Sequence, residues 1–347
     1  MRKAPEAGNE IMIKRKYSII LGNLGNTCDR FLSSGYKDAL DKRRMIEQAA
    51  SIAGVTGIEL VGTWDIDDKS VVSMKASLKA HNLECASIIP DLFAQKRWGR
   101  GALASRDPAI RRQAVAEVNR MTDIAVELGG SLINLWPGQD GYDYPLVADY
   151  LQERKWLLDT IGQCAQHAKS KGVRIALEFK MKEPRTHSYL ARTADTLLVA
   201  NHLGMDNVGV CIDTGHAFLA YENVGESVAL LKLFGDKLFH MHFNDNFGAW
   251  DDDMIVGSIR LPEYFEMLYW LGRTGYDGWF SMDQYPYRED GLGAIRSSVR
   301  FLQRMHALLD YAGPDTVSTL LLQADPVATA DFIREHLIAK PRTPALD

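Results

Sequence analysis

The sequence predicts an α/β chain folded as a (β/α)8 TIM barrel with a C-terminal helical extension. Eight short apolar runs, typical of buried parallel strands, alternate with amphipathic segments along most of the 347 residues. Glycines that suit a left-handed helix end stand just before predicted strands, at Gly54, Gly129, Gly172, Gly204, Gly235 and Gly272. An open doubly wound sheet would use fewer strands and a glycine-rich phosphate turn, of which Gly22-Asn23-Leu24-Gly25 is only a weak version.

The predicted strands cover residues 17–21, 57–61, 84–89, 131–135, 173–177, 208–212, 237–242 and 278–282. Amphipathic stretches predict helices between them, for example at residues 38–53, 108–128, 150–171 and 261–271. Residues 293–312 suit a closing helix, and residues 315–338 suit one or two more. We therefore expect an N-terminal tail at 1–16, a barrel domain at 17–312 and a helical extension at 313–347. We expect the extension to contact a neighbouring subunit, in a homodimer or homotetramer, or the barrel floor.

The composition argues against several classes of protein. A formal net charge of -5 gives no excess of Lys and Arg for a nucleic-acid surface. No run of about 18 apolar residues is present to span a membrane, and residues 1–16 lack the apolar region of a signal peptide. The four cysteines, at positions 28, 85, 164 and 211, form no CxxC pair, so we expect reduced core residues. These features predict a cytoplasmic protein that binds neither nucleic acid nor membranes.

Side chains of metal-binding type stand at the ends of the last four predicted strands. These residues are Glu178, Asp213, His242 and Asp283. Because the carboxyl ends of barrel strands meet at one mouth, we expect them to lie close together. Hard divalent cations such as Mg²⁺ and Mn²⁺ prefer a donor set of this kind, with several carboxylates and an imidazole. The sequence therefore predicts a metal site at the mouth of the barrel.

A second group of such residues follows in the neighbouring loops. His216 comes three residues after Asp213. Asp251 and Asp253 are spaced so that both point the same way in an extended loop. These residues could bind a second ion, although residues 251–253 also fit a solvated acidic loop.

Two further residues suit a substrate with a carbonyl group. Lys180 is predicted to share a face with Glu178, where its ammonium could stabilise negative charge on an oxygen, although by itself it also fits a surface lysine. Trp136 ends the fourth predicted strand and could form an apolar wall that excludes water and stacks on a sugar, or could simply pack at the rim. His240 is expected to face away from His242 and to lie in the core or behind the ligands.

Several stretches resemble those of one known family. Residues 178–184, Glu-Phe-Lys-Met-Lys-Glu-Pro, are similar to the Glu-Pro-Lys-Pro-x-Glu-Pro stretch of the metal-dependent aldose–ketose isomerases among the xylose isomerase-like (β/α)8 barrels. Residues 250–253, Trp-Asp-Asp-Asp, resemble the Trp-Asp-Thr-Asp loop of the same enzymes. The L-rhamnose isomerases are more similar still, with Glu-His-Lys-Met-x-Glu-Pro, Asp-Leu-Gly-His, His-Phe-Asn-Asp and Asp-Asp-Asp at the places of residues 178–184, 213–216, 242–245 and 251–253. The resemblance covers residues 17–312, with specific motifs only in the second half.

This resemblance implies an enzyme that converts an aldose into its ketose by a hydride shift between C1 and C2. It also implies one or two divalent ions per subunit, Mn²⁺ or Mg²⁺, with Co²⁺ and Zn²⁺ as alternatives. The first ion would be held by Glu178, Asp213, His242 and Asp283, and the second by His216, Asp251 and Asp253 with Glu178 shared. Catalytic roles fall to Lys180, Glu178 and Asp253, and sugar-binding roles to Trp136, Lys180, His216, Glu183 and Asp65.

Asp65 enters this set because of a departure from the isomerases. They usually carry a histidine after the second or third strand that assists opening of the sugar ring, whereas the only histidine in the first 166 residues is His81, at a predicted helix end. Asp65 is the candidate for that role. The sugar would then be a pentose, branched pentoses such as apiose included, or a deoxyhexose.

The same fold leaves other functions open. Ketose 3-epimerases move a proton at C3 with two metal-binding glutamates and end their last strand with Met-Glu-Pro, where this chain has Met282-Asp283-Gln284. The second acidic cluster has no purpose in a one-metal epimerase. Apurinic endonucleases share the Asp-x-x-His-Ala-Phe pattern of residues 213–218 but require early zinc-binding histidines and a basic DNA face. A non-enzymatic binding or scaffold protein is the remaining alternative.

Overall fold

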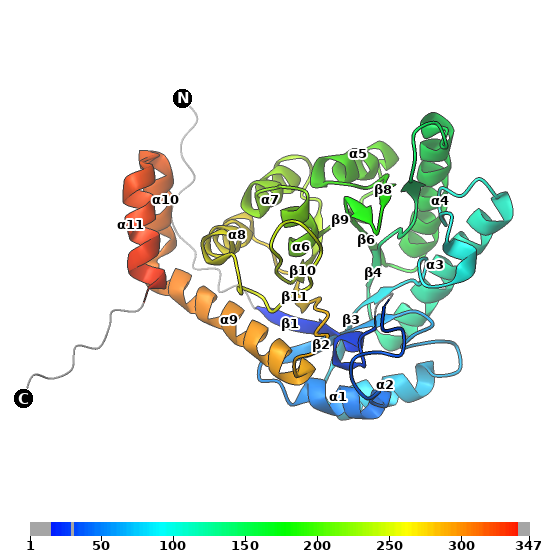
Figure 1. Ribbon diagram of the computed structural model, residues 1–347, viewed down its shortest axis with the longest axis horizontal. Helices are drawn as coiled ribbons and strands as arrows, with labels where there is room; N and C mark the ends of the chain where they lie inside the picture. Colours follow the sequence, from blue (N-terminus) through cyan, green and yellow to red (C-terminus); the bar gives the residue numbers. More distant parts are fainter. Residues whose placement is uncertain (1–14, 29–30, 339–347) are drawn as a thin grey trace, which may run out of the picture.

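The computed structural model describes residues 15–28 and 31–338, and these residues form a closed barrel of parallel strands. Around the barrel the strand order is β1-β11-β10-β9-β6-β4-β3-β2 (Figure 1). The strands are β1 Lys16–Ile20, β2 Val55–Val61, β3 Glu84–Ile89, β4 Leu132–Leu135, β6 Arg174–Glu178, β9 Val208–Asp213, β10 Leu238–Phe243 and β11 Trp279–Met282. The predicted TIM barrel is therefore confirmed. Of the predicted tail, residues 1–14 lie outside the described residues.

Helices surround the barrel because their apolar faces pack against the outward side of the strands, as in other α/β barrels. They are α1 Lys42–Ala50, α2 Val71–Ala80, α3 Pro108–Leu128, α4 Tyr150–Ser170, α5 Thr193–Leu203, α6 Thr214–Leu219, α7 Val224–Leu233, α8 Leu261–Thr274 and α9 Gly291–Ala312. Two short 3-10 helices, η1 Leu21–Leu24 and η2 Lys96–Trp98, lie in loops.

Five of the six predicted glycines stand at or shortly after a helix end, because Gly172 and Gly235 come two residues after α4 and α7, and Gly54 comes four residues after α1. Gly129 and Gly204 cap α3 and α5 in the left-handed conformation, with φ of 83° and 62°. The expectation for Gly272 is wrong, because α8 continues through this residue and ends at Gly275, whose φ is 76°. A glycine inside a helix can adopt ordinary helical angles, so its presence alone does not mark the end.

A small antiparallel sheet forms in the loops at the mouth and was not predicted. It consists of β5 Gly141–Tyr142, β8 Thr186–Ser188 and β7 Lys182–Glu183, in that order. Because β5 follows β4 and the other two strands follow β6, the sheet joins two loops at the carboxyl ends of neighbouring barrel strands. This pairing gives a defined path to the chain that follows Lys180.

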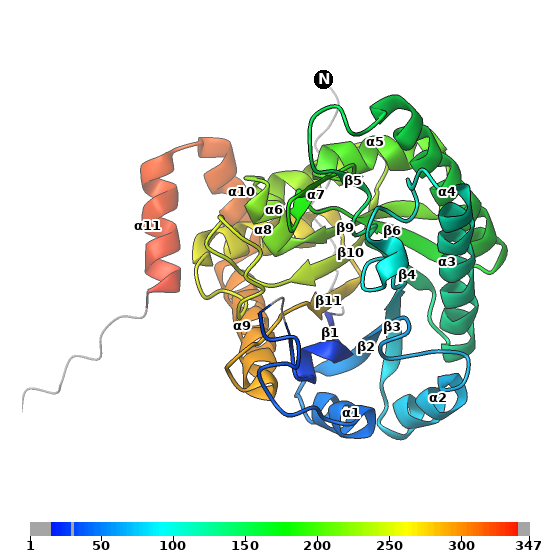
Figure 2. The ribbon, with the colours of Figure 1, turned by 45° about the vertical axis from the view of Figure 1, so that its right-hand side comes forward.

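Two helices follow the closing helix α9, as expected for residues 315–338. They are α10 Pro314–Gln323 and α11 Pro326–Leu337, and they lie at one side of the molecule (Figures 1 and 2). They contact α8 there, through the rings of Phe332 and Phe265 and a hydrogen bond between Ser318 and Tyr269. None of the helices within residues 15–28 and 31–338 is long and apolar enough to cross a lipid bilayer. Three cysteines are buried as expected, but Cys28 is exposed in the loop after η1, so the expectation of four core cysteines is wrong.

Candidate metal centre

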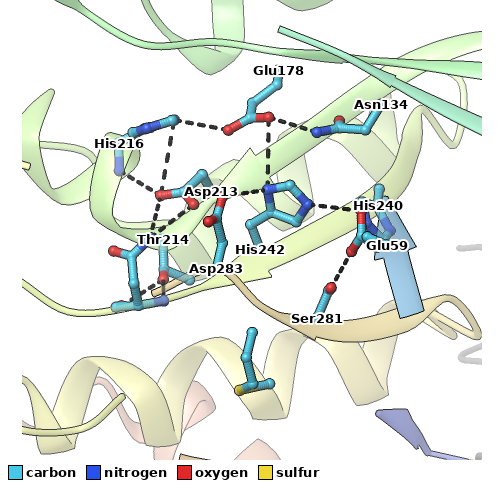
Figure 3. A network of polar contacts seen from close by, with 12 residues as sticks. Glu59, Asn134, Glu178, Asp213, Thr214, His216, His240, His242, Ser281 and Asp283 are labelled. Carbon is cyan, nitrogen blue, oxygen red and sulfur yellow. Dashed lines mark hydrogen bonds and ion pairs between the residues drawn. The ribbon is translucent and has the colours of Figure 1, made fainter. Parts of the chain in front are cut away.

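The four predicted ligands of the first ion converge at the carboxyl ends of β6, β9, β10 and β11 (Figure 3). Ligand atoms of Glu178, Asp213, His242 and Asp283 all lie within 4.8 Å of one another. His242 Nδ1 is 3.1 Å from Asp283 Oδ2 and 3.6 Å from Glu178 Oε2. Asp213 pairs directly with His242, whereas Glu178 pairs with Cys211 and His242 with Ser281, so the strands are staggered and the ligands meet at their carboxyl ends.

The donor atoms fit a divalent ion. His242 Nδ1 is buried and has no hydrogen-bond partner, although it faces two carboxylates. A buried polar atom without a partner is costly, and an ion between the imidazole and the carboxylates would satisfy it. Oxygen ligands with one imidazole are typical of Mg²⁺ and Mn²⁺ sites, and a tetrahedral zinc site would also accept them.

A second cluster adjoins the first and shares Asp213 with it. Ligand atoms of Asp213, His216 and Asp251 lie within 4.8 Å of one another. His216 stands on α6, whose first turn is held by Asp213 Oδ1 accepting from the His216 amide at 2.8 Å. Its Nδ1 is 3.2 Å from Glu178 Oε1, and its Nε2 is 3.2 Å from Asp251 Oδ2. His216 therefore lies between the two clusters.

Asp253 stands beside these clusters without joining either group of ligand atoms among the described residues. Burial, followed by the charges of Asp251 and Asp283, raises the pKa of Asp253 well above its ordinary value. Its backbone has a left-handed φ of 49°, and its carbonyl accepts from the Tyr285 amide at 3.0 Å. Asp253 is thus an acid held close to other acids, where it keeps a proton readily.

Lys180 is buried at the edge of the second cluster. Its ammonium lies 2.8 Å from Asp251 Oδ2 and contacts Glu183 on β7. The same ammonium lies over the Trp136 ring, 5.4 Å from the centroid. Burial lowers the pKa of Lys180, but Asp251 and Glu183 more than reverse this and hold the pKa well above its ordinary value. Lys180 is therefore a fixed positive charge at the barrel mouth.

Aromatic side chains line the mouth next to this lysine. The Trp136 ring is 4.8 Å from that of Phe93, which in turn lies 5.5 Å from the ring of Trp64. Phe93 also packs against a small apolar cluster at the ends of β1, β2 and β3. The first three strands thus present apolar groups to the mouth, whereas β6 to β11 present charged ones.

The pKa values of the carboxylates in the two clusters shift in opposite directions. Burial raises the pKa of Asp213 to about 7. Burial would also raise the pKa of Glu178, but the imidazoles of His242 and His216 more than offset it and hold the pKa below its ordinary range. Burial would likewise raise the pKa of Asp251, but the ammonium of Lys180 more than offsets it and holds this pKa below its ordinary range. The cluster therefore mixes carboxylates that ionise readily with carboxylates that retain protons near neutral pH.

Asp65 is placed differently from the other predicted residues. It is buried in the turn after β2, where its Oδ2 accepts from the Val61 amide at 2.9 Å. Burial raises the pKa of Asp65 to about 6. One carboxylate oxygen of Asp65 already accepts a hydrogen bond from the backbone. The predicted role of Asp65 in opening a sugar ring stays a prediction.

Two asparagines orient ligands and were not singled out from the sequence. Asn134 on β4 donates to Glu178 Oε2 at 2.6 Å. Asn244, directly after β10, donates to both oxygens of Asp213, at 3.1 and 2.9 Å. Both asparagines are fully buried, Asn134 within the apolar strand β4 and Asn244 just after β10, and a polar residue at such a position was the available signal in the sequence.

His240 is buried behind the ligands, as expected, but its orientation differs from the prediction. It faces the same side of β10 as His242, and the two rings lie 4.9 Å apart. The expectation that it faces away is wrong, because residues two apart in a strand share a face. Both rings contact Glu59, which was not predicted from the sequence although it is the one acid in the otherwise largely apolar strand β2.

The fold agrees with the comparison to known families. The model of the xylose isomerase-like TIM barrel family matches residues 46–305, and the chain belongs to this family. Its sequence is 27% identical over 308 residues to the xylose isomerase of Thermus thermophilus, covering 85% of this chain and 79% of that protein. The xylose isomerase of Fervidobacterium gondwanense is 29% identical over 233 residues, or 65% of this chain and 53% of the other.

Several solved structures with the same fold are sugar epimerases. A D-psicose 3-epimerase from Clostridium cellulolyticum H10 with D-tagatose superposes with a TM-score of 0.66 at 17% identity, covering 84% of this chain and 99% of the other. An L-ribulose 3-epimerase gives a TM-score of 0.66 at 16% identity, covering 86% of this chain and 97% of the other. The relatives of this chain are therefore enzymes that isomerise or epimerise sugars.

Proposed function

We propose that the protein is a metal-dependent aldose–ketose isomerase that moves a hydride between C1 and C2 of a pentose or deoxyhexose. The observation that carries this proposal is the second cluster, in which Asp251 is held between His216 and Lys180. An enzyme that uses one ion to move a proton at C3 has no need of this cluster. The sequence relatives that are xylose isomerases support the same reaction.

In this proposal Glu178, Asp213, His242 and Asp283, whose ligand atoms converge, hold one Mn²⁺ or Mg²⁺ ion. His216 and Asp251, with Asp253 beside them and Glu178 shared, hold a second. Bound divalent ions would supply Lewis acidity that stabilises negative charge on the sugar oxygens. The identity of the metal is also part of this proposal, and Co²⁺ and Zn²⁺ are the alternatives to Mn²⁺ and Mg²⁺.

The residues of the chain have distinct roles in the hydride shift. The hydrogen on C2 of the aldose moves with its electron pair to C1, while the C2 hydroxyl loses a proton and the C1 oxygen gains one. Lys180 donates a hydrogen bond to the C1 oxygen and stabilises its developing negative charge. Asp253, which keeps its proton readily beside the other acids, gives that proton to the C1 oxygen and takes up the proton that the C2 hydroxyl loses. Trp136 and Phe93 exclude water from the apolar side of the mouth.

A ketose 3-epimerase is the second candidate, and a specific observation favours it. Glu178 and Asp283 belong to the same cluster but come from β6 and β11, which are not neighbours in the barrel. Two carboxylates approaching from different strands could remove a proton from one face of C3 and return one to the other face. The similarity in fold to 3-epimerases supports this candidate about as well as the xylose isomerase relatives support the isomerase.

Proton NMR in D₂O distinguishes the two reactions. Metal-stripped protein, with and without added Mn²⁺, is incubated with pentoses, apiose and deoxyhexoses as aldoses and ketoses, and the ion is chelated before each spectrum. Metal-dependent aldose–ketose conversion with little deuterium uptake supports the isomerase. Deuterium at C3 of a ketose supports the epimerase instead.

Glu178→Gln tests the metal assignment, since it keeps the size of the side chain but removes a carboxylate that belongs to the first cluster and contacts His216 of the second. It is expected to lose conversion in the presence of Mn²⁺. Full activity of this variant contradicts the metal assignment, and inactivity of the wild-type protein on every sugar contradicts both candidate functions.

A further inference from the structure

A buried polar network lies beneath the candidate metal centre, inside the barrel. At its centre is Glu59 of β2, which is fully buried and accepts hydrogen bonds from four side chains. Its donors are His240 Nε2 at 2.9 Å, His242 Nε2 at 3.2 Å, and the hydroxyls of Ser87 and Ser281. A buried carboxylate with two bonds to each oxygen is well satisfied, so it has little freedom to move.

The network spans the inside of the barrel. Strands β2 and β10 are not neighbours, because β1 and β11 lie between them. Glu59 therefore crosses the interior to reach both histidines of β10 (Figure 3). Such a contact fixes the position of the imidazole more firmly than a neighbour on the same strand would.

This contact determines which nitrogen of His242 faces the ligands. Nε2 donates its hydrogen to Glu59 Oε2, so Nε2 is not available to a metal. Nδ1, on the other side of the ring, faces Asp283 at 3.1 Å and Glu178 at 3.6 Å. A carboxylate behind a metal-binding histidine fixes the ring and makes its other nitrogen a better ligand.

We propose that Glu59 is a positioning residue that holds His242 with Nδ1 turned to the bound ion, and that it sets the metal affinity of the site. The inference rests on the proposed metal-dependent function. Glu59 itself lies outside the group of ligand atoms formed by Glu178, Asp213, His242 and Asp283. His240 serves the same arrangement, because it binds the other oxygen of Glu59 and keeps the carboxylate from turning.

Glu59→Gln tests this role with little change in volume. A glutamine offers one oxygen acceptor, and its amide nitrogen would face an imidazole N–H. If the amide nitrogen faces His242, the ring must move its proton to Nδ1, which then cannot bind an ion. If it faces His240 instead, His242 keeps its orientation but loses the negative charge behind it.

The primary measurement is the dissociation constant of Mn²⁺ alone, by electron paramagnetic resonance of the free ion over metal-stripped protein. Glu59→Gln is expected to raise it about 10–100-fold, as for other residues behind metal ligands. Glu117→Gln is the matched control, since Glu117 is also buried but pairs with Arg120 on α3, outside the barrel. This control is expected to bind Mn²⁺ as the wild-type protein does.

A second readout follows the imidazole itself. In ¹⁵N NMR of the protein with Mg²⁺, the wild-type His242 should show a protonated Nε2 and an unprotonated Nδ1, and Glu59→Gln should change this pattern or shift the Nε2 signal. Should Glu59→Gln not fold, Glu59→Asp keeps the charge but shortens the reach by one methylene, and it is expected to weaken Mn²⁺ binding as well.

The outcomes separate this inference from the function on which it rests. An unchanged Mn²⁺ dissociation constant and unchanged His242 signals in a folded Glu59 variant overturn the positioning role. A wild-type protein that binds no Mn²⁺ overturns the metal centre itself.

Discussion

Gly215 provides a sharp test of how closely the candidate metal centre is packed. It lies in the first turn of α6, where a Cβ atom would be 2.0 Å from Asn244 Oδ1 and 3.0 Å from Asp251 Oδ1. Asn244 is fully buried, and its amide nitrogen holds both oxygens of Asp213. We predict that Gly215→Ala displaces Asn244, destabilises the protein and weakens metal binding.

The expected magnitude follows from these contacts. Real Cβ atoms essentially never approach another atom closer than 3.0 Å, so Asn244 must move by roughly 1 Å. Overpacking costs about 1–3 kcal/mol, and the lost hydrogen bonds to a charged carboxylate cost about 1.5–3 kcal/mol. Alanine regains about 1 kcal/mol as a better helix former. The free energy of unfolding should therefore fall by about 1.5–5 kcal/mol.

Urea denaturation of the metal-free protein and Mn²⁺ titration measure the two effects. Gly272→Ala is the matched control, since a Cβ there meets no atom within 4 Å and should leave stability unchanged or slightly higher. A Gly215→Ala protein that matches the wild type in both stability and Mn²⁺ affinity would refute the packing argument.

Three further predictions concern charge. Lys180→Met removes the ammonium beside Asp251, and it should lower kcat by about 10²–10³-fold while Mn²⁺ still binds, as steady-state kinetics and titration would show; an unchanged kcat contradicts the role of Lys180. Because burial raises the pKa of Asp213 to about 7, protons compete with the ion below that pH, so Mn²⁺ affinity should rise with pH between about 6 and 8 and binding should release protons. Calorimetry in two buffers of different ionisation enthalpy tests this, and affinity independent of pH speaks against it. Asp140 accepts hydrogen bonds from the amides of Ala102, Leu103 and Ala104 at 2.8 Å each. Asp140→Asn should lower the free energy of unfolding by about 1–3 kcal/mol, because one of these amides would lose its acceptor. Urea denaturation indistinguishable from that of the wild type would contradict this prediction.

Much of the fold could be predicted from the order of residues along the chain. A buried parallel strand needs a continuous apolar run, and each run here ends where the chain reaches the mouth of the barrel. Glu178, Asp213 and His242 end or nearly end such runs, and for this reason their approach to one another could be predicted without knowing any contact.

Other parts of the site depend on contacts between distant segments. The small sheet of β5, β7 and β8 pairs two short loops whose sequences carry no strand pattern. Gly215 and Asn244 are far apart along the chain, and the close approach between them exists only because β9 and β10 are neighbours. The same dependence on tertiary contacts holds for Lys180 and Asp251.

By itself the sequence determined the barrel, the level at which the ligand-type residues stand and the two helices at its end, because burial along a strand or helix is a periodic, local property. Only the tertiary structure decided which side chains meet inside the barrel. Glu59 and His242 are 183 residues apart and stand on strands that do not pair, so their contact depends on the closure and stagger of the whole barrel. Because the barrel closes, the carboxylate of Glu59, an acid in an apolar strand, contacts and holds His242 at the candidate metal centre.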